Sequence, residues 1–354
     1  MSRKLITIST IMTLMSTSVI ADVPNVAADI APIHSLVSRV MDGVGAPKLI
    51  VQSGASPHGY RLRPSEAKAL QDADHVFWMG EELTPWLDSA IGTLASKASV
   101  TTLLDQQGVI LHDFREGALF EAHDHSAHGD DDHDDHDDHD DHDDHKDHDD
   151  HDDHKDHDDH DDHDDHDDHK GHDDHDDHDD HDDHGSHDPH AWLSPENAKL
   201  WLNIIASKLS VSDPENAATY FMNAAAGQAE IEAMIAEVKA TLKPVQGGKF
   251  VVFHDAYQYF ENDFDFYASG AISLGDSSDP SPARIEKVQK RIRDEGIQCV
   301  LAEPQFKKGL VATVMEGSDA TASVIDPLGA ELETGPKLYT RLIKNMAKTL
   351  RNCL

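Results

Sequence analysis

The sequence is short of basic residues, of long apolar stretches and of familiar catalytic motifs. Lys and Arg number 29 against 69 Asp and Glu, so no basic surface is available for nucleic acid. After the first 21 residues, no segment approaches the roughly 20 apolar residues that a membrane-spanning helix needs. The chain contains no His-Glu-x-x-His, Gly-x-Ser-x-Gly or glycine-rich phosphate loop, so no local motif announces an enzyme.

The N-terminus has the pattern of an export signal. Arg3 and Lys4 precede a largely apolar run, Leu5 to Ile20, that ends in short residues suitable for cleavage. We therefore predict a signal peptide over residues 1–21 and a mature exported chain that begins at Asp22. An uncleaved membrane anchor is the alternative.

Cysteine is almost absent, with only Cys299 and Cys353 in the whole chain. An even number of cysteines in an exported protein is most simply explained by one disulfide. Two buried free thiols are the alternative that the sequence leaves open.

Residues 123–187 form a long His-Asp-Asp repeat with 22 His, 34 Asp and 3 Lys, which contributes −31 of the net charge of −40. With almost no apolar side chain to bury, this segment is expected to be disordered without a ligand. Imidazoles among carboxylates suit Zn²⁺, Cu²⁺ or Ni²⁺, whereas a merely solubilising acidic tract has no use for a His every third residue. The repeat is thus predicted to be an auxiliary metal-binding loop, whose candidate ligands include His123, His125, His128, His133, His136, His139, His184 and His187.

On both sides of the repeat, short β-branched runs alternate with helical patterns, which predicts βαβ units and mostly parallel sheets. We expect an N-terminal α/β lobe over residues 22–212, a linker helix over 213–243 and a C-terminal α/β lobe over 244–354. The long helix, expected over 214–242, would span about 43 Å and join the lobes; a helix within one domain, or one broken near Gly227, is the alternative. Strands are expected at 23–28, 48–52, 74–78, 99–103, 250–253, 265–271, 298–302 and 323–325, and other helices at 32–41, 194–209, 255–261, 282–295, 307–315 and from 64, 84 and 336.

Four residues stand where open parallel sheets place ligands, just beyond strand-like or apolar segments: His58, His190, His254 and Asp326. None has a partner at local chelating spacing, and a lone His is more often a structural residue than a ligand. Their spacing alone does not establish a site.

Five motifs give these residues a family context. In chain order they are GASPHGYRLRPS from residue 54, DPHAWLSP from 188, VFHDAYQYF from 252, AEPQF from 302 and IDPLG from 325. Together they resemble the metal-binding solute receptors of ABC importers, and they are most similar to the periplasmic zinc-binding receptors of the ZnuA type. The similarity spans nearly the whole mature chain.

The resemblance implies a metal held in a cleft between two α/β lobes, with His58, His190 and His254 as ligands. His254 favours Zn²⁺, because family members for Mn²⁺ or Fe²⁺ usually have a carboxylate there. Asp326 matches a ligand of several members. In some zinc receptors a Glu just before the first His serves instead, but here that residue is Pro57, so Asp326, water or another carboxylate is the fourth ligand.

The resemblance also assigns supporting roles. It strengthens the pairing of Cys299 with Cys353, and a His-rich insertion ahead of the second ligand is a trait of zinc receptors. The chemistry of the neighbouring residues suggests further roles. Asp188 and Asp255 are expected to orient imidazoles or to cap helices. Trp192 and Tyr257 are expected to pack beside the ligands or to belong to the ordinary core, and Glu303 to make a supporting contact or salt bridge rather than to bind the metal.

The function implied is a monomeric periplasmic receptor that delivers Zn²⁺ to an ABC permease and its ATPase in the inner membrane. The alternatives are a zinc buffer acting through the repeat, a manganese or iron receptor of the same family, and a zinc hydrolase or lyase. The last is disfavoured because no separate general base or substrate-orienting motif is visible.

Overall fold

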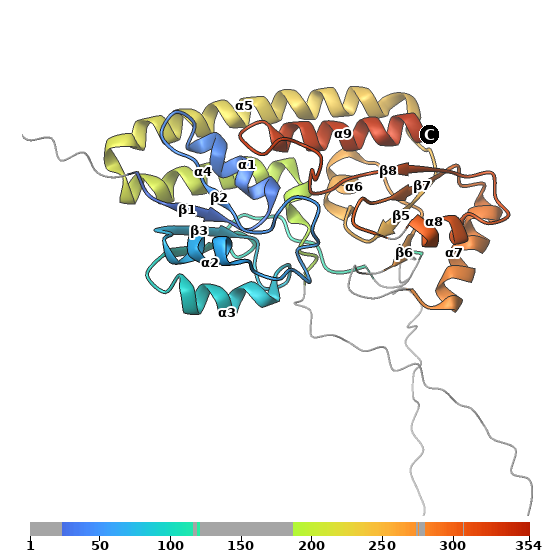
Figure 1. The fold of residues 1–354 in the computed structure, drawn as a ribbon. Helices are drawn as coiled ribbons and strands as arrows, with labels where there is room; N and C mark the ends of the chain where they lie inside the picture. The colour runs from blue at the N-terminus through green and yellow to red at the C-terminus, as the bar shows by residue number, and fades with distance from the viewer. Residues whose placement is uncertain (1–22, 116–118, 121–186, 274, 276–279, 307) are drawn as a thin grey trace, which may run out of the picture. The chain divides into compact units, whose positions relative to one another are not determined.

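The chain forms two four-stranded parallel sheets, one from residues before the His-Asp-Asp repeat and one from residues after it in the sequence (Figure 1). The computed structural model describes residues 23–115, 119–120, 187–273, 275, 280–306 and 308–354. The predicted signal peptide and residues 123–186 of the repeat lie outside the described residues. The two α/β sheets confirm the predicted fold class, while the lobe boundaries remain a prediction.

The first sheet has the strand order β2-β1-β3-β4, with every neighbouring pair parallel. Its strands and helices are β1 (Val26–Ala28), α1 (Ala31–Val40), β2 (Lys48–Leu49), α2 (Pro64–Gln71), β3 (His75–Trp78), α3 (Pro85–Leu94) and β4 (Ser99–Thr102). Strands β1 and β3 are buried throughout, as expected for central strands covered on both faces. Each of the three helices has a proline in its first turn, where the missing N–H costs no helical hydrogen bond.

The second sheet repeats this arrangement with the order β6-β5-β7-β8, again fully parallel. Its elements are β5 (Phe250–His254), α6 (Gln258–Phe264), β6 (Ala271–Ser273), α7 (Pro282–Glu295), β7 (Cys299–Ala302), α8 (Lys308–Val314), β8 (Thr321–Val324) and α9 (Leu338–Cys353). Cys299 and Cys353 form a disulfide that joins β7 to the end of α9. The predicted pairing is confirmed.

Two predicted elements of the second lobe are wrong in position. The helix expected over 255–261 begins only at Gln258, because the chain first makes a turn in which the Ala256 N–H donates to the His254 carbonyl. The strand expected over 265–271 is β6, which begins at Ala271. Asp265 adopts a left-handed conformation with φ of 51° and ends α6, so the segment that follows cannot begin as a strand.

A long helix connects the two halves. After a 3₁₀ turn η2 (Ala191–Leu193) come α4 (Pro195–Ser212), the turn η3 (Pro214–Asn216), α5 (Ala217–Leu242) and the turn η4 (Lys243–Val245). Helix α5 packs on α1 and α4 and also on α9, beside which it runs in Figure 1. It is unbroken at Gly227, where an added Cβ would lie 2.9 Å from Leu202 Cδ1. The predicted joining helix is therefore confirmed, and the alternative break near Gly227 is wrong.

The largest hydrophobic core draws residues from both sheets and from the joining helices, including Phe77, Trp192, Tyr257 and Ile325. A smaller core lies against each sheet as well. Within the described part of the chain, none of the helices combines the length and apolarity required to cross a membrane.

Candidate metal centre

Three histidines from separate segments of the chain lie next to one another. His58 is on the loop after β2, His190 immediately precedes the turn η2, and His254 is the last residue of β5. The ring centroid of His190 is 5.8 Å from that of His58 and 5.3 Å from that of His254. We call these three residues the histidine cluster. His190 occupies its middle.

Buried carboxylates orient two of the three rings. His190 Nδ1 lies 2.6 Å from Asp188 Oδ1, which also accepts the His190 backbone N–H. His254 Nδ1 lies 2.6 Å from Glu303 Oε1. An ionised carboxylate only accepts hydrogen bonds, so each Nδ1 carries the proton and the ring lone pair is on Nε2. A ring held in this way is prepared to bind a metal through Nε2.

In the part of the chain that the structure describes, no three His, Cys, Asp or Glu side chains are arranged to hold one metal ion. Asp326 occupies the turn after β8: its Oδ1 accepts the Leu328 and Gly329 backbone N–H groups, and its Oδ2 accepts that of Ala330. These bonds organise the turn and leave the fourth ligand a prediction.

Aromatic side chains form the apolar surroundings of the cluster. The Trp192 ring lies 5.2 Å from that of His190, and its Nε1 donates to the Pro327 carbonyl at 2.8 Å. Tyr257 is buried with its ring 6.3 Å from that of His254, and burial, followed by the charge of Glu303, raises the pKa of its phenol. Both aromatic residues thus lie beside the cluster and belong to the hydrophobic core, an environment that strengthens electrostatic interactions.

Asp255, the residue after His254, has a different partner from the imidazole that the sequence suggested. Its carboxylate accepts hydrogen bonds from Arg115, which also donates to Glu261. Burial raises the pKa of both carboxyl groups, and Arg115 opposes this increase. Arg115 was not predicted from the sequence, because its two partners are 140 and 146 residues away and no motif surrounds it.

The two chain segments that flank the repeat lie side by side. Asp113 and His187 form an isolated antiparallel bridge, with His187 Nδ1 2.9 Å from Asp113 Oδ1. The Tyr259 hydroxyl donates to the Asp188 carbonyl and accepts from the His112 backbone N–H. His187 is the only predicted repeat ligand among the described residues; His123, His125, His128, His133, His136, His139 and His184 lie outside them.

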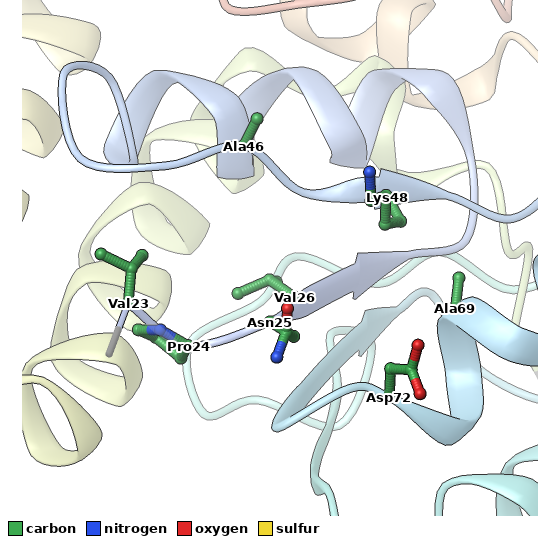
Figure 2. Close-up of a pocket in the computed structure, with 8 residues that line it drawn as sticks. All are labelled: Val23, Pro24, Asn25, Val26, Ala46, Lys48, Ala69 and Asp72. Carbon is green, nitrogen blue, oxygen red and sulfur yellow. The ribbon is translucent and has the colours of Figure 1, made fainter. Parts of the chain in front are cut away.

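A separate surface pocket lies at the opposite edge of the first sheet. Figure 2 shows Val23, Pro24, Asn25 and Val26 at the start of β1 together with Ala46, Lys48, Ala69 and Asp72. The parallel strands carry the histidine cluster beyond their carboxyl ends, whereas this pocket is at their amino ends. It is therefore distinct from the candidate site, and its lining has no imidazole or thiol.

The chain is similar over nearly its whole length to proteins of zinc uptake systems. It is 47% identical over 329 residues to the high-affinity zinc uptake system protein ZnuA of Brucella abortus (strain 2308), covering 93% of this chain and 91% of the relative. It is 43% identical to the ZnuA protein of Paracoccus denitrificans (strain Pd 1222), with coverage of 94% and 93%.

The fold is shared more widely. A crystal structure of ZnuA matches with a TM-score of 0.66 at 19% identity, covering 94% of this chain and 99% of that one. The solute-binding protein FpvC of Pseudomonas aeruginosa, solved in complex with Mn²⁺, matches with a TM-score of 0.67 at 16% identity, covering 94% and 98%. The fold alone therefore does not select the metal.

The family assignment rests on a match that spans nearly the whole chain. Residues 26–353 match the family model described as ZnuA, the periplasmic component A of the zinc-uptake complex. That range contains both sheets, the joining helix and all three members of the histidine cluster. This chain belongs to the ZnuA family of periplasmic zinc-uptake components.

Proposed function

We propose that this protein binds Zn²⁺ through His58, His190 and His254 and delivers it to the permease of an ABC importer in the inner membrane. The observation that carries the proposal is the ring contact of three histidines, two of them oriented by buried carboxylates. In this role the metal is cargo, and no covalent bond of a substrate is made or broken.

The spacing of the rings supports zinc as that cargo. Two imidazoles on a tetrahedral zinc ion, with Zn–N of about 2.0–2.1 Å, place their ring centroids about 5 Å apart. The pairs His190–His254 and His58–His190 are at 5.3 and 5.8 Å, so a small contraction brings the nitrogens to ligating distance. Imidazole donors suit Zn²⁺, whereas carboxylate and water suit Mn²⁺.

The fourth coordination position is assigned to Asp326, to water or to another carboxylate. Asp326 Oδ2 accepts one backbone N–H and Oδ1 accepts two, so Oδ2 is the oxygen with more capacity for a metal. The electrostatic effect of Asp326 on the buried Tyr257 supports a position near the cluster.

The ligand assignment is tested by replacing His58, His190 or His254 with Ala, one at a time, in the full mature chain. Each change removes one donor from a four-coordinate site and should weaken the tight zinc site at least tenfold, by analogy with the loss caused by mutating even an outer-shell partner. His75→Ala is the matched control, because this buried histidine lies at the amino end of β3 and contacts Ser212. A variant that keeps the tight site excludes its residue from the ligand set.

We further propose that the repeat supplies additional weaker sites, as an auxiliary metal loop. Deleting residues 124–186 should lower the number of zinc ions bound while the tight site stays nearly unchanged. As the pH falls towards 5 the weak sites should empty first, because the preorganised cluster gives up less conformational entropy for each metal ion bound. Calorimetric titration of both proteins tests this, and loss of the tight site on deletion would instead favour a zinc buffer that acts through the repeat.

We also propose that the protein is exported to the periplasm and acts as a monomer. The family description is periplasmic, which agrees with the signal peptide predicted over residues 1–21. Delivery requires a permease and its ATPase, the partners proposed for this chain.

A further inference from the structure

Arg115 joins the segment that leads into the repeat to the neighbourhood of the histidine cluster. Its Nε lies 3.0 and 3.1 Å from the two oxygens of Asp255, and its Nη1 lies 2.6 Å from Glu261 Oε2. Its Nη2 contacts both carboxylates. The guanidinium carbon also lies 3.6 Å from the ring centroid of Phe120. The planar, five-donor guanidinium therefore binds two carboxylates while it stacks on an aromatic ring.

The two carboxylates are buried, with side-chain exposures of 7% for Asp255 and 1% for Glu261. Two buried negative charges need a cation or protons, because an unpaired buried charge is costly. Arg284 also interacts electrostatically with Asp255, but its guanidinium donates to the carbonyls of Ile272 and Ala271. Arg115 is thus the cation whose N–H groups are committed to Asp255 and Glu261.

The position of Asp255 gives this contact a consequence for the metal. Asp255 directly follows His254, and it is close enough to Asp188, which orients His190, for the two carboxyl groups to interact electrostatically. Carboxylate oxygen is a donor that suits Mn²⁺ as well as Zn²⁺. Both Asp255 oxygens accept from Arg115, which opposes their recruitment as metal ligands.

We propose that Arg115 is a positioning residue that holds the Asp255 carboxylate away from the histidine cluster and so keeps the cluster selective for zinc over manganese. This inference rests on the proposed zinc site. It assigns to Arg115 a role in selectivity, beyond the docking of the segment that carries it.

The test compares two metals, because this distinguishes the effect of losing a positive charge from the effect of gaining a carboxylate ligand. Removing a nearby positive charge strengthens the binding of every divalent cation by a similar factor, which cancels in the ratio of zinc to manganese affinity. A newly available carboxylate ligand changes that ratio, because it favours manganese. In Arg115→Ala we therefore expect the ratio of zinc to manganese affinity at the tight site to fall by about tenfold. This is the lower end of the loss in metal affinity that follows removal of an outer-shell partner.

Two further variants identify the carboxylate responsible. Arg115→Ala/Asp255→Ala should recover the wild-type preference, because the competing ligand is gone. Arg115→Lys keeps the charge but cannot bind both carboxylates with a planar fork, so its preference should fall by less than that of Arg115→Ala. Arg115→Lys also provides the measurement if Arg115→Ala does not fold.

The assay is competition of Mn²⁺ against one equivalent of Zn²⁺ on the full mature chain. The triple variant His58→Ala/His190→Ala/His254→Ala measures the metal that is bound outside the histidine cluster, including by the repeat. Bound Co²⁺ gives a second readout, since an added oxygen ligand lowers the intensity of its visible absorption bands. Arg291→Ala is the matched control: Arg291 donates to the Leu119 carbonyl of the same segment at 2.8 Å, without an observed bond to Asp255.

The outcomes are distinct. If wild type and the triple variant bind zinc equally, the proposed zinc site is wrong. If wild type has the tight site but Arg115→Ala keeps both the metal preference and the Co²⁺ spectrum, the role of Arg115 is refuted. An equal fall in Arg291→Ala, or failure of the double variant to recover the preference, also refutes it, because docking alone would then explain the effect.

Discussion

Glu303→Gln tests the orientation of a candidate ligand without removing that ligand. The Glu303 side chain has no exposed surface, and its Oε1 accepts from His254 Nδ1 at 2.6 Å. Its other oxygen accepts from Gln305 Nε2 at 3.0 Å. The carboxylate thus fixes the proton on Nδ1 and leaves the lone pair on Nε2. Glutamine has nearly the same shape but lacks the charge and has only one oxygen.

The expected loss follows from the two orientations open to the amide. If its oxygen faces His254, the tautomer is kept and only the charge-assisted part of the hydrogen bond is lost. If its NH₂ group faces His254, Nδ1 must accept, and the proton moves to the nitrogen that would bind the metal. Loss of an outer-shell partner typically lowers metal affinity about 10- to 100-fold, which corresponds to about 1.4 to 2.7 kcal/mol of binding free energy.

The assay is a competition titration of the tight site with a zinc chelator, accompanied by thermal unfolding of the metal-free protein. Asp213→Asn is the matched control, since this buried carboxylate accepts hydrogen bonds from Asn216 and Tyr220 at the start of α5. It should lower stability but leave zinc affinity unchanged. If Glu303→Gln binds zinc as tightly as wild type, the carboxylate does not orient a ligand and the argument fails.

Two other predictions concern stability. Replacing Cys299 and Cys353 with Ser opens a crosslink across 54 residues and should lower the free energy of unfolding by about 4 kcal/mol in chemical denaturation; two titratable thiols in the denatured, unreduced wild type would contradict it. Burial raises the pKa of Asp29 from 3.8 to about 7, despite backbone N–H donors that lower it. The folded state therefore holds a proton on the Asp29 carboxyl up to a higher pH than the unfolded state does. The stability that this proton contributes is fully present below about pH 4 and is lost as the pH rises through about 7. The loss is at most about 4 kcal/mol of unfolding free energy. Asp29→Asn should remove this part of the pH dependence. If the unfolding free energies of wild type and Asp29→Asn change in parallel from pH 4 to 8, the pKa of Asp29 is not raised.

The elements predicted well are those whose signals are complete within a few residues. Helix α7 begins at Pro282 after Ser281, whose Oγ accepts the Arg284 N–H, and it ends at Glu295 before Gly296 with φ of 64°. Both ends are thus specified locally. Strand β6 has only three residues, and its position is set by pairing with β5. The local sequence pattern therefore predicted this strand too early in the chain.

The residues of the candidate site also differ in whether a local motif specifies them. The motifs identified all three histidines, but the partners that orient them come from different ranges of the chain. Asp188 is two residues from His190, within its motif, whereas Glu303 is 49 residues from His254 and is brought there by the pairing of β5 with β7. No local pattern specifies such a contact. Arg115 was missed for the same reason, since the fold alone brings it to Asp255.

Different contacts hold the three histidines in place. His254 is fixed by its register opposite Ser273 in the sheet and by Glu303. His190 is fixed by Asp188 and packs beside Trp192. His58 is half-buried on a turn-rich loop, and the neighbouring Pro57 carbonyl accepts a hydrogen bond from Trp86 Nε1. The longer of the two ring separations also involves His58. Buried carboxylates thus preorganise the rings of His190 and His254 as candidate ligands.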